Sequence, residues 1–137
     1  MSEAHETFFT SVGCMDGRVQ EPILAYGKLK FGVKYADTIT EAGLVGVLAK
    51  ERVNPDLLDS IKNKLLISIE KHHSKAVVVH GHQACAGNPV GDDQHLKDTL
   101  RATEVIRTLV PEGVEVIPVF LSIDSSANFG WTIKELI

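Results

Sequence analysis

Short apolar runs alternate with longer amphipathic segments along most of the chain. Residues 7–12, 34–40, 76–80 and 114–123 are rich in β-branched and aromatic residues, or alternate apolar with polar positions, and predict four strands. The run 76–80 (AVVVH) is apolar until its last residue, which is typical of a parallel strand covered on both faces. The sequence therefore predicts a sheet with residues 76–80 near its centre.

Helices are predicted between these strands. The clearest start signal is Asn54–Asp56, a capping residue followed by proline and an acid. Pro22 predicts the first turn of an earlier helix, residues 42–50 a short helix, and residues 92–93 the cap of a later one. The buried face of that later helix is expected to contain Leu96, Leu100, Ile106 and Leu109. Residues 131–137 are expected to form a short terminal helix or tail.

The order of these elements predicts the fold class. Strand, helix, strand, helices, strand, helix and strand indicate an α/β protein: a mainly parallel four- to five-stranded sheet with helices on both faces. Pro118 is expected to weaken the last predicted strand or to place it at an edge of the sheet. The 137 residues contain no internal repeat or linker, so residues 1–137 are expected to form a single domain.

Composition narrows the class of protein. A hydrophobic content of 44% and a charged content of 23% are ordinary for a soluble globular chain. With a net charge of −4, the chain has no basic footprint for nucleic acid or an anionic membrane. No apolar run is long enough to span a membrane, and residues 1–6 do not resemble a secretory signal. We therefore expect a cytoplasmic protein with no nucleic-acid or membrane partner.

Two short segments carry residues suited to chemistry. Cys14–Arg18 (CMDGR) follows the first predicted strand, and His82–Cys85 (HQAC) follows the apolar strand at 76–80. If the two strands are parallel neighbours, their carboxyl ends lie side by side, where open α/β sheets bind ligands. Thiolates and imidazole are the usual zinc ligands. The two segments therefore predict a zinc ion held by Cys14, His82 and Cys85.

Three protein ligands leave one position open, as in catalytic zinc sites. Water at that position can have a pKa lowered to about 7. Asp16 and Arg18 are the candidate catalytic residues, because a bidentate Arg18 would keep the Asp16 carboxylate ionised and oriented toward this water. Alternatively, Asp16 could move onto the metal as a fourth ligand and close the site.

Simpler interpretations exist for each residue taken singly. A buried cysteine after a strand is usually a small core residue, and Asp-x-Arg is usually a structural or surface ion pair. A disulfide between Cys14 and Cys85 is disfavoured in a reducing compartment. His80 is a rival ligand, but it is expected to pack or to line the pocket. Glu41 could line the pocket too, although an acid at a helix start is the favoured interpretation.

The two segments together resemble those of the β-class carbonic anhydrase family. That family has Cys-x-Asp-x-Arg after its first strand and His-x-x-Cys after a later one, and Ser68–Glu70 is similar to its Ser-x-Glu. By this resemblance Cys14, His82 and Cys85 are the zinc ligands, and Asp16 with Arg18 is the catalytic pair. The resemblance implies reversible hydration of CO₂ to bicarbonate by zinc-bound hydroxide, a parallel α/β fold, and a homodimer or higher homo-oligomer.

The chain departs from the family pattern after its second predicted strand. Residues 40–44 (TEAGL) stand where the family has Arg-Asn-Ala-Gly-Asn, and Ala86 stands where it has glycine. The sequence therefore resembles a short, divergent member of the family.

Four alternative functions are compatible with these residues. The first is a carbonic anhydrase-like zinc lyase. The second is a zinc hydrolase of a CO₂-like sulfur compound, COS or CS₂, and the third is a catalytically silent zinc-binding homologue closed by Asp16. The fourth is a redox protein with a Cys14–Cys85 bridge.

Overall fold

A single five-stranded sheet forms the centre of the protein in a computed structural model that describes residues 6–137. The strand order is β2-β1-β3-β4-β5; the first four strands are parallel and β5 runs antiparallel to β4. The strands are β1 (Phe8–Cys14), β2 (Tyr35–Glu41), β3 (Val77–His82), β4 (Val116–Ile123) and β5 (Trp131–Glu135). The predicted mainly parallel sheet is therefore confirmed.

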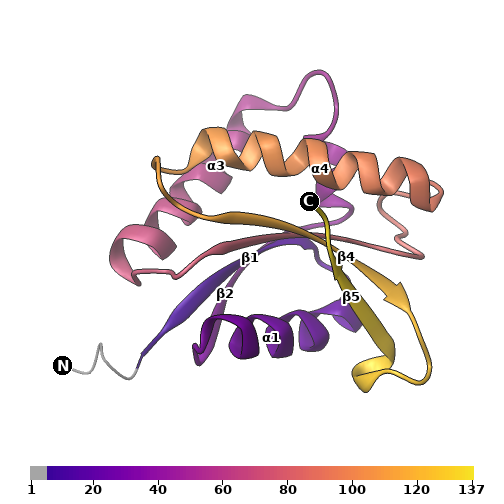
Figure 1. Ribbon diagram of the computed structural model, residues 1–137. Helices are drawn as coiled ribbons and strands as arrows, with labels where there is room; N and C mark the ends of the chain where they lie inside the picture. The colour runs from indigo at the N-terminus through magenta and orange to yellow at the C-terminus, as the bar shows by residue number, and fades with distance from the viewer. Residues whose placement is uncertain (1–5) are drawn as a thin grey trace.

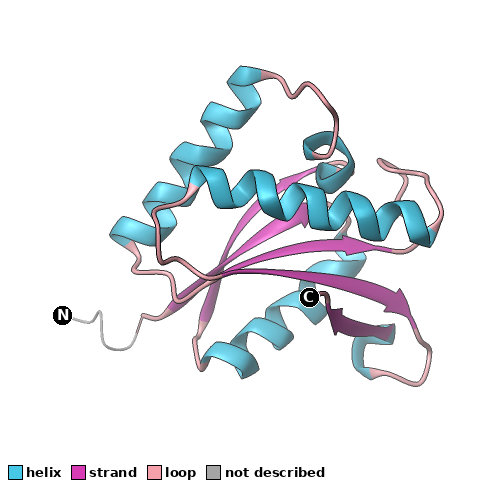
Figure 2. Ribbon diagram, turned by 45° about the horizontal axis from the view of Figure 1, so that its top comes forward, coloured by secondary structure: helices cyan, strands magenta, loops and turns pink. Residues whose placement is uncertain are grey.

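Helices cover both faces of this sheet, as predicted. They are α1 (Gly17–Phe31), α2 (Leu44–Leu48), α3 (Pro55–Leu66), its π-helical continuation η2 (Ile67–Lys71), α4 (Asp92–Leu109) and the short 3₁₀ turn η3 (Asn128–Gly130). Figures 1 and 2 show α1 under one face of the sheet and α3 with α4 over the other. Across residues 6–137, no helix combines the length and the apolar character that crossing a membrane requires. The prediction that residues 1–6 are not a secretory signal concerns mostly residues 1–5, which lie outside the described residues.

The two faces of β3 belong to two separate cores. Val77 and Val79 pack with α2, α3 and α4, whereas Val78 packs with α1 and β5. Successive strand residues point to opposite faces. The unbroken valine run is therefore explained by burial of both faces.

The helix starts confirm one prediction and correct another. At α3 the Asn54 side chain accepts a hydrogen bond from the Asp56 N–H at 2.8 Å, as its sequence predicts. The prediction that Pro22 lies in the first turn of α1 was wrong, because Asp16 caps that helix by accepting from the Arg18 N–H at 2.9 Å. The start of α1 is therefore part of the segment with the candidate chemistry.

The start of α4 and its buried face also differ from the prediction. Gly91 is the N-cap, and Asp92 and Asp93 lie in the first turn without capping it. Leu100 is 40% exposed, and the buried residues are His95, Thr99, Ala102, Thr103 and Ile106. The threonines can be buried because each hydroxyl donates to a carbonyl of its own helix: Thr99 to His95 at 2.8 Å and Thr103 to Thr99 at 2.7 Å.

The C-terminal segment was predicted incorrectly as a helix or tail. Residues 131–135 form β5, which pairs with β4 from Val119↔Glu135 to Ile123↔Trp131. As a result β4 is an inner strand, and Pro118 does not place it at an edge of the sheet. Pro118 is paired with Val79 of β3 and immediately precedes Val119, the first β4 residue paired with β5; its carbonyl accepts from the Leu136 N–H at 2.8 Å. The nitrogen and the carbonyl oxygen of a strand residue face the same neighbour, so the N–H that proline lacks would have faced Leu136, and the pairing of β4 with the C-terminal segment ends here.

A glycine on α1 allows that helix to lie close to β1. A Cβ at Gly27 would lie 2.1 Å from Cζ of the fully buried Phe9. We expect Gly27→Ala to lower the free energy of unfolding by about 1–3 kcal/mol, measured by urea denaturation, because the core must shift to accept the methyl group. Gly17→Ala is the control, since among residues 6–137 nothing lies within 4 Å of a Cβ at Gly17. Equal stability of the two variants would contradict this account of α1 packing.

Candidate metal centre

Three of the predicted site residues meet at the carboxyl ends of β1 and β3. The strands pair in parallel through Gly13↔His80, so Cys14 and His82 end neighbouring strands, and Cys85 follows in the loop after β3. One ligand atom from each of Cys14, His82 and Cys85 lies within 4.8 Å of the other two, and all three residues are buried. The structure therefore brings together the three residues that the sequence predicts as zinc ligands.

The two sulfurs and the imidazole of this cluster are not tied up by a disulfide or an ion pair with each other. The two Sγ atoms are 3.7 Å apart and both cysteines are free. His82 Nδ1 donates to the Gln83 carbonyl at 2.7 Å, because a carbonyl oxygen only accepts, and Nε2 is left as an acceptor. Within the described residues the buried Nε2 has no hydrogen-bond partner. Nε2 therefore offers its lone pair to the space between the two sulfurs, where a ligand would satisfy it.

Asp16 and Arg18 form the predicted ion pair. Arg18 Nε lies 3.1 and 3.2 Å from the two carboxylate oxygens of Asp16, and Arg18 Nη2 donates to Oδ2 at 2.6 Å. These bonds hold the pKa of Asp16 at about 2, although burial opposes the shift. Arg18 Nη2 also donates to the Ala84 carbonyl at 3.0 Å. The pair therefore links the start of α1 to the loop between His82 and Cys85.

The groups around the cluster include a negative carboxylate and a neutral imidazole, which lie close together. Asp16 Oδ2 lies 4.0 Å from His82 Nε2, and burial lowers the pKa of His82, so the imidazole is neutral at neutral pH. Burial, with the neighbouring Cys14 adding to it, raises the pKa of the Cys85 thiol. The Asp16 carboxylate, which is paired with Arg18, thus lies near the nitrogen lone pair of a neutral imidazole. Two sulfurs and one imidazole nitrogen are a donor set that suits zinc.

The segment after β2 contributes a backbone donor that sequence reasoning missed. The Gly43 N–H donates to Cys14 Sγ at 3.3 Å. Gly43 has φ +61°, and a Cβ there would lie 2.4 Å from the backbone of Gly87. Only glycine fits both the left-handed conformation and this close approach. The loop after β2 therefore packs against the loop that follows Cys85, and it directs a backbone N–H at the Cys14 sulfur.

Two further candidates lie outside the cluster. Glu41 is the exposed last residue of β2, opposite Cys14 in register, and α2 begins only at Leu44, so the helix-start interpretation was wrong. His80 is fully buried and packs, as expected: its Nε2 lies 3.1 Å from Ser11 Oγ and its ring lies against Gly13. Burial lowers the pKa of His80 to about 3, so its imidazole is neutral and structural.

Aromatic residues that had no predicted role surround His82. Trp131 of β5 meets the His82 ring edge-on, with centroids 5.9 Å apart, and the His95 ring of α4 lies 6.1 Å from it. Arg18 Cζ lies 5.6 Å from the centroid of the Trp131 ring. No local sequence motif predicts these contacts, because each of them joins residues that are distant in the sequence.

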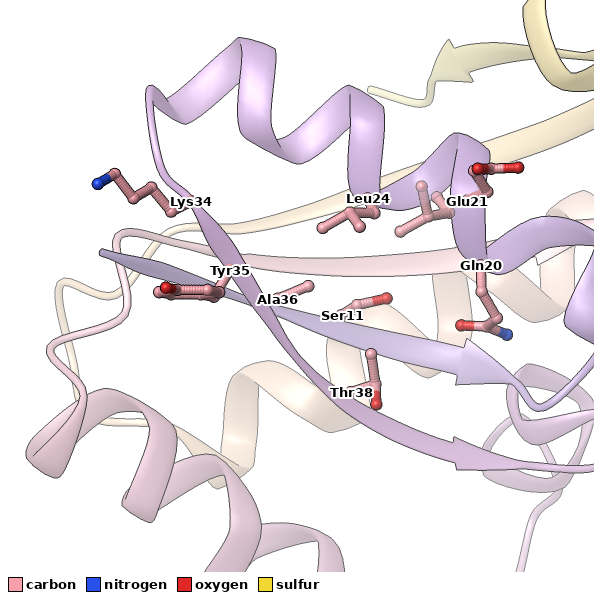
Figure 3. A pocket seen from close by; sticks show the side chains of 9 residues that line it. Ser11, Gln20, Glu21, Leu24, Lys34, Tyr35, Ala36 and Thr38 are labelled. Carbon is pink, nitrogen blue, oxygen red and sulfur yellow. The ribbon is translucent and has the colours of Figure 1, made fainter. Parts of the chain in front are cut away.

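A separate cavity of about 420 Å³ lies between α1 and the edge strand β2 (Figure 3). It is lined by Ser11, Gln20, Glu21, Ile23, Leu24, Lys34, Tyr35, Ala36 and Thr38. None of the candidate metal ligands lines this cavity. Gln20 connects the two regions, since its amide donates to the carbonyls of Cys14 at 2.9 Å and Asp16 at 2.8 Å.

Comparison with known proteins identifies the family. A family model described as "Putative carbonic anhydrase" matches residues 4–129. The chain belongs to this carbonic anhydrase family. No curated protein sequence matches the chain.

Two solved structures are similar to the protein. The β-carbonic anhydrase CafA of Aspergillus fumigatus has 19% identity and a TM-score of 0.51, with 96% of this chain and 76% of that chain covered. A carbonic anhydrase from Streptococcus mutans has 17% identity and a TM-score of 0.45, with 93% of this chain and 81% of that one covered. At this identity the likeness to CafA shows a shared α/β fold.

The ion pair at the start of α1 gives a prediction about protonation. In metal-free protein, ¹³C NMR of the carboxyl groups should show Asp16 titrating near pH 2, and Arg18→Gln should raise this pKa toward 3.8. Because the folded pKa lies below the unfolded one, the pair stabilises the fold above about pH 4 and ceases to do so as the pH falls toward 2. Arg107→Gln, which removes an arginine paired with Glu104 on α4, should leave Asp16 unchanged. An unaltered Asp16 pKa in Arg18→Gln would show that another group holds the carboxylate ionised.

Proposed function

We propose that this protein is a zinc-dependent lyase of the carbonic anhydrase type, which interconverts CO₂ and bicarbonate. One observation carries the proposal: the buried, unpartnered Nε2 of His82 and the two free thiols converge within 4.8 Å. Membership of the carbonic anhydrase family supports the reaction class. Cys14, His82 and Cys85 would hold the ion.

The residues present fit zinc. Thiolate and imidazole ligands are those that zinc prefers, and three protein ligands match a catalytic rather than a structural site. Zinc, when bound, would supply the Lewis acidity that lowers the pKa of water toward neutrality. Two thiolates neutralise much of its charge, so the surrounding residues must provide further orientation and polarisation.

Asp16 is suited to orient the attacking water. Its carboxylate would accept a hydrogen bond from the nucleophile, which fixes the proton on the side away from CO₂ and directs an oxygen lone pair at carbon. Arg18 donates hydrogen bonds to both carboxylate oxygens of Asp16 and keeps the group ionised, so that Asp16 acts as an acceptor only. The Ala84 carbonyl holds Arg18 from the other side. The pair thus supplies both charge and direction.

Two competing functions use the same cluster. A hydrolase of COS or CS₂ would employ the same nucleophile, and the departure from the family pattern at residues 40–44 is where a different pocket would arise. A silent zinc-binding homologue would have Asp16 on the metal in place of its contacts with Arg18. A cytoplasmic location and a homodimer or higher homo-oligomer stay predictions from the sequence and the family resemblance.

Metal content is the first test. Purified protein should contain one zinc per chain by elemental analysis, and Cys85→Ser or His82→Ala should reduce zinc affinity at least about tenfold, because a site of three protein ligands loses one of them. His72→Ala is the matched control, since His72 is an exposed histidine that contacts Asp37 and Phe8 outside the cluster. Equal zinc affinity in all variants would place the metal elsewhere.

Activity is the second test. Stopped-flow assay of zinc-loaded protein should show CO₂ hydration above the buffer rate, and Asp16→Asn should lower the turnover by about 10²-fold or more, because the amide cannot replace an ionised acceptor. Sulfide release from COS or CS₂ without CO₂ hydration would instead indicate the hydrolase. Zinc binding with no turnover on any of these substrates would favour the silent homologue.

A further inference from the structure

The C-terminal strand supplies a wall of the candidate site. The family match ends at residue 129, and β5 begins at Trp131. Trp131 is the single tryptophan of the chain and is 8% exposed. Its ring contacts both His82, a candidate metal ligand, and Arg18, the partner of Asp16. A residue beyond the matched region therefore contacts two parts of the site.

The two contacts restrict different motions. The guanidinium carbon of Arg18 lies 5.6 Å from the ring centroid, within the range at which a cation is attracted to the face of an indole. The ring planes of Trp131 and His82 meet at 84°, an edge-to-face contact. The Arg18 side chain is 54% exposed, so without the indole its long chain would have more conformations available. The indole therefore selects the Arg18 conformation that engages Asp16.

The strand that carries Trp131 is fixed to the helix that carries Arg18. Glu135, at the other end of β5, accepts a hydrogen bond from the Tyr26 hydroxyl at 2.5 Å and an ion pair from Lys30 at 2.7 Å, both on α1. Ladder pairing with β4 places Trp131 opposite Ile123. Figure 1 shows β5 (yellow) next to α1 (indigo to purple). The indole and the guanidinium thus lie on two elements that are also joined at the far end of β5, through Glu135.

We propose that Trp131 is a positioning residue, which holds the Arg18 guanidinium in place to orient Asp16 and shields the His82 ring from water. The proposal rests on the proposed function for its effect on turnover, but the contact itself is independent of metal and substrate. Trp131 touches no reacting atom and acts through Arg18 and His82.

Hydrogen exchange of the Arg18 side chain tests the contact directly. In metal-free protein, Trp131→Leu should speed exchange of the Arg18 Nε–H, followed by NMR, by about two- to fivefold, the factor expected for the loss of one cation–π contact. Trp131→Phe, which keeps an aromatic face, should speed it less. Ile133→Ala is the matched control: Ile133 packs on the same core from β5, so this variant loosens the strand and leaves the indole in place.

The reciprocal variant uses the fluorescence of the single tryptophan. Arg18→Gln should shift the Trp131 emission to longer wavelength and increase its quenching by acrylamide, because the guanidinium no longer covers the ring. Arg101→Gln, on the exposed face of α4, should change neither property.

Turnover connects the contact to function. In zinc-loaded protein, Trp131→Leu should lower kcat by about two- to fivefold with little change in KM and with the zinc content retained, while Trp131→Phe keeps more of the turnover. Ile133→Ala should retain the wild-type kcat. A Trp131→Leu variant with the exchange rate and kcat of the wild type would overturn the proposal. Absence of CO₂ hydration in the wild type would refute only the proposed function, because exchange and fluorescence would still decide whether Trp131 positions Arg18.

Discussion

The candidate site depends on the parallel pairing of β1 with β3. The register Gly13↔His80 sets two strand ends side by side, and the residues that follow, Cys14 and His82, then lie at the same edge of the sheet. A slip of one residue would turn the side chains of one strand to the opposite face and separate the donors. The register is held by burial on both faces, since the valines of β3 belong alternately to two apolar cores.

Around this pairing the protein arranges one buried acceptor, on His82, and one partly exposed acceptor, on Asp16. His82 is fixed by its own loop carbonyl with Nε2 unpaired, while Asp16 is kept ionised by Arg18. Such an arrangement lowers stability unless a cation or a donor completes it. The free energy gained by burying the surrounding cores offsets this cost, and the three donor residues are held where a metal ion could bind them.

Several contacts at the site come from segments distant in the sequence. The N–H of Gly43 reaches Cys14 from the loop after β2, and Trp131 reaches Arg18 from β5. Residues 40–44 differ from the β-carbonic anhydrase pattern that the sequence resembles, and within them Gly43 acts through its backbone N–H at a position that only glycine fits. The support that this segment gives to the cluster therefore comes from its backbone.

The sequence by itself determined the features that local physics controls. Periodicity and burial predicted the strands at β1 to β4, the Asn54 cap predicted the start of α3, and the spacing of cysteine and histidine predicted which residues meet. The tertiary structure decided that residues 131–135 are a strand, because that segment gains its hydrogen bonds only from β4. It also decided the buried threonine face of α4 and the position of Trp131. These features depend on contacts with residues far along the chain, and a local sequence pattern does not contain the free energy of such contacts.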